Sequence, residues 1–111
     1  MPESDGRDIV KWRARIDELD LQLIKLLNER ARCAIRIGRI KRKRKMRIYD
    51  PKREEQIIWM MTERNQGPLD ATGVRRLFER IIDESRRIER IAAERRVQRQ
   101  GSRVAGKVAD E

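Results

Sequence analysis

The chain has 111 residues, of which 43% are charged and 38% hydrophobic, and its formal net charge is +10. A single cysteine, Cys33, and no histidine exclude an intramolecular disulfide, a Cys/His zinc site and acid–base catalysis by histidine. The polar start MPESDGRD lacks the apolar segment of a signal peptide, and no apolar run approaches membrane-spanning length. We therefore expect a cytoplasmic protein that binds anionic partners and no membrane.

The spacing of the apolar residues predicts an all-α chain, since no run alternates apolar with polar residues as a half-buried strand does. A first helix is expected over about residues 7–44. Asp50 and Pro51 suit the N-cap and first position of a second helix, over about residues 51–65. A third helix should follow over about residues 70–96.

The predicted first helix is too long for a monomer of this size. About 36 residues span on the order of 54 Å, whereas a compact domain of about 100 residues has a radius of gyration of about 13 Å. We therefore expect a three-helix protomer that forms an intertwined homodimer, with the two long helices sharing one core. The helical domain should cover residues 1–97, and residues 98–111 should form a disordered basic tail.

Polar residues lie on the apolar stripes of two predicted helices. At about 100° per residue, Lys41 falls at the centre of the stripe of the first helix, and Arg30 lies about 20° from it. On the third helix, Ser85 and Glu89 are one turn apart on the inward face. These positions would normally carry aliphatic side chains.

The second helix adds two carboxylates, since Asp50 and Glu54 can share a face with Arg53 on its flank. Any one of these polar residues could extend its charged head to water or form an ion pair. Several together, from separate helices, are harder to explain, because taking an ion out of water costs several kcal/mol. The pattern therefore predicts a polar pocket for an anionic ligand inside a helical bundle.

Five motifs in order resemble the all-α chorismate mutase family. They are R-x-x-I-D-x-L-D at 13–20, L-L-x-E-R at 26–30, I-G-x-x-K at 37–41, Y-D-P-x-R-E at 49–54 and L-F-x-x-I-I-x-E-S at 77–85. The resemblance covers roughly residues 8–96. It implies an intertwined dimer with two active sites, which converts the dianion chorismate to prephenate without a metal or cofactor.

The resemblance also implies the roles of eight residues. Arg30 would grip a substrate carboxylate from the same chain, and Arg13 would reach a carboxylate from the partner chain. Lys41 would contact a carboxylate and the ether oxygen of the breaking C–O bond, to which Glu89 would also donate a hydrogen bond. These assignments make Arg30, Lys41 and Glu89 catalytic. The remaining contacts, to the ring hydroxyl, the pocket wall and a carboxylate, would come from Asp50, Glu54, Arg53 and Ser85.

The protonation state of Glu89 is open at the level of sequence. A carboxyl group donates a hydrogen bond only when it is protonated. An apolar wall would raise the pKa of Glu89, whereas the nearby cations would lower it.

Three alternatives remain. An isochorismate pyruvate lyase would share the fold, although Asp50 and Glu54 follow the mutase pattern more closely. A basic helical dimer could bind nucleic acid through KRKRK at 41–45, but the chain has few aromatic residues for stacking and no helix-turn-helix spacing, so nucleic acid is the less favoured partner. A structural helical dimer without a ligand is the third.

Overall fold

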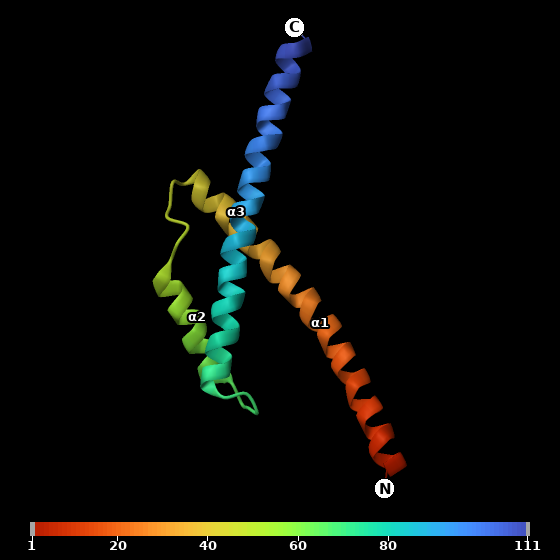
Figure 1. Ribbon diagram of the computed structural model, residues 1–111. Helices are drawn as coiled ribbons and strands as arrows, with labels where there is room; N and C mark the ends of the chain where they lie inside the picture. Colours follow the sequence, from red (N-terminus) through yellow and green to blue (C-terminus); the bar gives the residue numbers. More distant parts are fainter. Residues whose placement is uncertain (1, 111) are drawn as a thin grey trace. The chain divides into compact units, whose positions relative to one another are not determined.

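The computed structural model describes the backbone of residues 2–110 and the side chains of residues 6–101. It contains three helices, α1 (Pro2–Lys43), α2 (Pro51–Arg64) and α3 (Ala71–Asp110), which are labelled in Figure 1. The prediction of an all-α chain with three helices and a long first helix is therefore confirmed. The chain divides into two compact units, Met1–Arg32 and Cys33–Glu111, and each is described by itself.

The start of α2 follows from its capping residues. Asp50 is the N-cap, and its side-chain Oδ1 accepts a hydrogen bond from the backbone N–H of Arg53 at 3.1 Å. Pro51 occupies the first turn, where a missing N–H costs nothing. After α2, the Asn65 side chain accepts from the N–H of Gly67 at 3.1 Å and donates to the carbonyl of Leu69 at 2.6 Å. These bonds hold the turn before α3.

α3 begins at a second aspartate cap and ends later than predicted. The Oδ1 of Asp70 accepts from the N–H of Gly73 at 2.7 Å. The helix then continues to Asp110, so the predicted end near residue 96 is wrong. The later residues lack an apolar stripe, but a stripe governs packing, and Ala, Gln, Arg and Lys residues that favour helix recur through this segment. The boundary at residue 97 between domain and tail stays a prediction.

The second unit has a small core where α2 and α3 lie side by side (Figure 1). Ile58 of α2 packs into it, and Val74 and Ile82 come from α3. Burying each such side chain contributes about 1.5–3 kcal/mol. Polar contacts at the edge of this packing include an ion pair between Arg75 and Glu55 at 3.4 Å. The packing fixes the first turn of α2 against the middle of α3.

The apolar side of α1 is left uncovered within one chain. Leu23 is 52% exposed and Leu26 is 61% exposed, and Ile16 and Leu19 are exposed as well. A water-exposed apolar stripe of this length is typical of a surface that another polypeptide covers. In the described residues no helix is both long and apolar enough to span a membrane.

Candidate active site

Glu89 of α3 packs against the last turns of α1. Gly38 is buried there, and a Cβ added to it would lie 3.5 Å from both Cγ and Cδ of Glu89. Arg42, one turn further along α1, donates a hydrogen bond to the backbone carbonyl of Glu89 at 3.3 Å. These contacts place the Glu89 carboxyl beside the segment of α1 that carries Lys41.

Burial raises the pKa of Glu89 above its ordinary value. The positive charges of Lys41 and Arg42 oppose this change but are smaller effects. Desolvation therefore decides the direction that the sequence left open. A carboxyl group with a raised pKa keeps its proton to a higher pH, and in that state it donates a hydrogen bond.

Lys41 lies where the chain turns back at the end of α1. Its backbone carbonyl accepts from the N–H of Met46 at 2.8 Å, and Lys45 adopts the left-handed φ of 56° that this turn needs. The half-buried side chain of Lys41 points toward the connection, where its Nζ is 3.5 Å from the carbonyl of Ile48. That distance is beyond the usual hydrogen-bond range. The ammonium group therefore makes a long contact with this carbonyl and a charge interaction with Glu89.

The first turn of α2 presents the predicted acids. Asp50 uses one carboxylate oxygen as the helix cap. Glu54, one turn later, forms an ion pair with Arg86 of α3 at 3.3 Å. The guanidinium of Arg53 bonds to Gln56 within the same helix at 2.9 Å. The helix cap therefore holds Asp50, and the ion pair with Arg86 separately holds Glu54.

Six of the eight predicted site residues belong to the unit Cys33–Glu111, namely Lys41, Asp50, Arg53, Glu54, Ser85 and Glu89. Of these, Lys41 and Glu89 interact electrostatically, and the hydroxyl of Ser85 donates to the carbonyl of Ile81 at 2.9 Å. Arg13 and Arg30 belong to the other unit, where Arg13 is exposed and Arg30 is half-buried. Their roles stay predictions.

Sequence reasoning did not find Arg42 or Arg86. Arg42 belongs to a run of cations that indicates a solvated connector, and Arg86 follows Ser85 directly and so points about 100° away from it. Both arginines make their contacts through long side chains. A helical projection gives only the direction of each residue from the helix axis, so it does not show how far a side chain extends.

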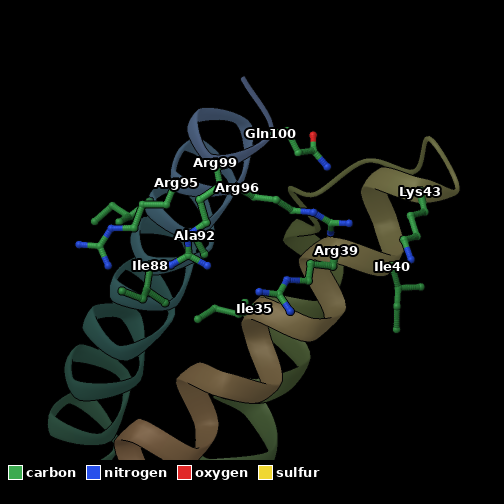
Figure 2. A pocket seen from close by; sticks show the side chains of 11 residues that line it. Ile35, Arg39, Ile40, Lys43, Ile88, Ala92, Arg95, Arg96, Arg99 and Gln100 are labelled. Atoms are coloured by element: carbon green, nitrogen blue, oxygen red, sulfur yellow. The ribbon is translucent and has the colours of Figure 1, made fainter. Parts of the chain in front are cut away.

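A separate cavity of about 560 Å³ lies between the end of α1 and the later turns of α3 (Figure 2). Neither Lys41 nor Glu89 lines it. Its lining includes four isoleucines and five cations, the cations being Arg39, Lys43, Arg95, Arg96 and Arg99. In the part of the chain whose side chains are described, no carboxylate pairs with them. The same residues contain no cluster of three potential metal ligands.

The family profile of chorismate mutase type II matches residues 12–90. The chain belongs to the chorismate mutase type II family. The matched stretch covers well over half of the chain and contains all eight predicted site residues. This type II chain also resembles solved structures over most of its helices.

One similar structure is a chorismate mutase (Form II) from Thermus thermophilus, with a TM-score of 0.73 and 34% identity over 74% of this chain and 93% of that chain. Another is the chorismate mutase from Helicobacter pylori in complex with prephenate, with a TM-score of 0.72 and 30% identity over 78% of this chain and 93% of that chain. This chain therefore shares its helical fold with the T. thermophilus and H. pylori proteins.

Curated relatives of this type II chain are longer proteins. A bifunctional chorismate mutase/prephenate dehydratase from Stutzerimonas stutzeri is 36% identical over 84 residues, which cover 71% of this chain and 23% of that protein. The protein of the same name from Pseudomonas aeruginosa is 37% identical over 84 residues, which again cover 71% of this chain and 23% of that protein. The chain therefore spans about a quarter of the length of these relatives.

Proposed function

We propose that the protein is a chorismate mutase, which rearranges chorismate to prephenate in phenylalanine and tyrosine biosynthesis. The observation that carries the proposal is the meeting of Lys41 on α1 with Glu89 on α3, a carboxyl group whose pKa is raised by burial. Family membership supports the same reaction. The similar enzyme from H. pylori was solved with prephenate bound.

The rearrangement is unimolecular, because the ether C–O bond breaks while a C–C bond forms within one molecule. The protein has only to hold the substrate in a compact chair and to stabilise the charge that develops on the ether oxygen. The ammonium of Lys41 and the protonated carboxyl of Glu89 are the two donors for that oxygen. Losing one preorganised donor typically lowers kcat by about 10²–10³-fold.

The remaining residues bind the dianion. Arg30 and Ser85 would take its carboxylates, and Arg53 would complete the wall. Asp50 and Glu54 would receive the ring hydroxyl, which a carboxylate suits because it accepts hydrogen bonds at both oxygens. Asp50 has one oxygen committed to the α2 cap, so its other oxygen would serve the substrate.

We extend the proposal to an intertwined homodimer in which Arg13 of each chain completes the partner's site. The 42 residues of α1 span about 63 Å, and its apolar side, including Leu23 and Leu26, is exposed in a single chain. Burying leucine side chains of this kind contributes about 1.5–3 kcal/mol each. A second copy of α1, running antiparallel, would cover this side and bring its Arg13 toward Lys41.

The test is the loss of chorismate absorbance with purified protein, with prephenate identified as the product. Lys41→Ala should lower kcat by about 10²–10³-fold while the helix content stays unchanged. Lys43→Ala, which removes a lysine of the same helical turn outside the predicted site, should keep normal turnover. A folded Lys41→Ala protein with near-normal kcat would contradict the assignment, and turnover of isochorismate instead would favour the lyase.

A further inference from the structure

Arg86 makes contacts that no predicted role accounts for. It follows Ser85 on α3, and its Nη2 lies 3.3 Å from a carboxylate oxygen of Glu54 on α2. The same guanidinium lies over the ring of Tyr49, 5.3 Å from its centroid, and it also pairs with Asp83. One side chain thus joins α3, the first turn of α2 and the connection that precedes it.

The positions of these partners matter for the proposed chemistry. Glu54 is a predicted substrate contact, and its side chain is only 20% exposed, against 42% for Arg86. A half-buried carboxylate depends more on its partner than a surface one does, because water compensates it less. Tyr49 directly precedes the N-cap Asp50, so the ring contact holds the segment that enters α2.

We propose that Arg86 is a positioning residue for the two acids of the substrate site, acting on Glu54 through the ion pair and on Asp50 through Tyr49. The inference rests on the proposed chorismate mutase function. Arg86 does not itself contact substrate in this arrangement, because its guanidinium is occupied by Glu54, Asp83 and the Tyr49 ring. Without it, Glu54 is free to change rotamer and to be solvated away from the ring hydroxyl.

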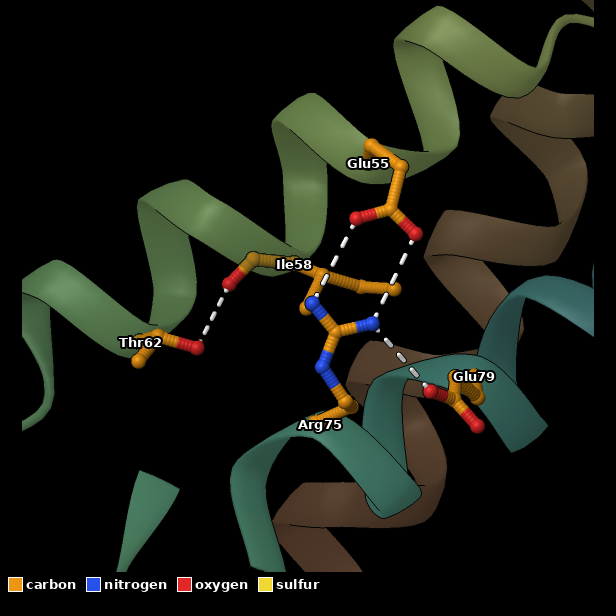
Figure 3. Close-up of polar contacts among 5 residues, drawn as sticks. All are labelled: Glu55, Ile58, Thr62, Arg75 and Glu79. Atoms are coloured by element: carbon orange, nitrogen blue, oxygen red, sulfur yellow. Dashed lines mark hydrogen bonds and ion pairs between the residues drawn. The ribbon is translucent and has the colours of Figure 1, made fainter. Parts of the chain in front are cut away.

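Arg75 provides a matched comparison. It joins the same two helices through an ion pair with Glu55, the neighbour of Glu54, at 3.4 Å, and it also pairs with Glu79 (Figure 3). Glu55 is not a predicted site residue, and its side chain is 67% exposed. Arg75→Gln therefore removes an α2–α3 ion pair of similar geometry that does not position the site.

The experiment compares kcat and KM for chorismate in Arg86→Gln and Arg75→Gln. Arg86→Gln should raise KM and lower kcat/KM about tenfold, since misplacing a contact group by about 1 Å can cost up to 10²-fold. Arg86→Lys, which keeps the charge but not the planar group, should recover part of the loss. Arg75→Gln should leave both constants unchanged, even where it lowers Tm.

A double-mutant cycle identifies the route. If Arg86 acts through Glu54, adding Arg86→Gln to Glu54→Gln should cost less than Arg86→Gln costs the wild type, and the loss that remains measures the route through Tyr49 to Asp50. Full additivity, or an unchanged kcat/KM in Arg86→Gln, would overturn the inference while wild-type turnover leaves the proposed function standing. A wild-type protein that does not turn over chorismate would overturn the function and, with it, this role of Arg86.

Discussion

Replacing Glu89 by glutamine tests the protonated carboxyl directly. Glutamine has nearly the same shape and donates a hydrogen bond at every pH, whereas the carboxyl group donates only while it holds its proton. Burial against α1 raises the pKa of Glu89, and the charges of Lys41 and Arg42 reverse only part of that change. The wild-type rate should therefore hold to a pH above the usual carboxyl range and then decline.

The size of the decline follows from titration of one group. Above the pKa of Glu89, the protonated fraction falls about tenfold for each pH unit, and kcat should fall with it. Lys41 remains as a donor, so the decline should stop once the contribution of one donor, about 10²–10³-fold, is lost. The alkaline limb should then level off after about two to three pH units. Glu89→Gln should be flat over the same range.

The assay is the initial rate of chorismate loss from about pH 4 to 9 at constant ionic strength, which brackets an ordinary and a raised carboxyl pKa. Glu84→Gln is the control, because Glu84 is a carboxylate of the same helix that pairs with Arg80 and Arg87 and is not a predicted site residue. Its profile should match the wild type. A Glu89→Gln enzyme that keeps the alkaline decline would refute the assignment of that limb to Glu89.

Two further predictions concern packing. Gly38→Ala should raise the free energy of unfolding by about 0.5–1 kcal/mol in urea denaturation, because an alanine suits a helix interior and its Cβ would meet Glu89 at an ordinary 3.5 Å; a lower stability would show that the added methyl does not fit. Leu23→Lys should yield a monomer without activity in sedimentation velocity and turnover assays, because the proposed dimer would bury the charge at a cost of several kcal/mol. Gln22→Lys, on the adjoining face of α1, should remain dimeric, and a dimeric, active Leu23→Lys would contradict the shared core.

The starts of α2 and α3 could be predicted from sequence because each depends on a few adjacent residues, whereas α1 begins at Pro2, earlier than the predicted residue 7. Asp50 and Pro51 form a local signal, and α2 begins where they place it. The end of α3 could not be predicted in the same way, because the segment after residue 96 has no strong stop signal and its missing stripe says nothing about helicity. A capping residue therefore marks the start of a helix, whereas the absence of an apolar stripe does not mark its end.

The site was predicted in part for a similar reason. Periodicity indicated that Glu89 faces inward, and the structure places it against Gly38 of α1. The direction of its pKa depends on how much apolar surface surrounds the carboxyl relative to Lys41 and Arg42, which no sequence pattern measures. Arg86 was missed because its contacts join three segments that are separated in the chain.

The uncovered apolar side of α1 also has a consequence during synthesis. α1 is made before α2 and α3, and a helix forms within about a microsecond, whereas the segment from the end of α1 to the end of α3 takes roughly 3 to 13 s to emerge at about 5–20 residues per second. For those seconds the helix displays Leu23 and Leu26 without the later helices that carry Glu54 and Glu89. In the proposed dimer, two nascent chains that meet early would shield each other from aggregation, so the yield of folded protein would depend on how close together the copies are translated.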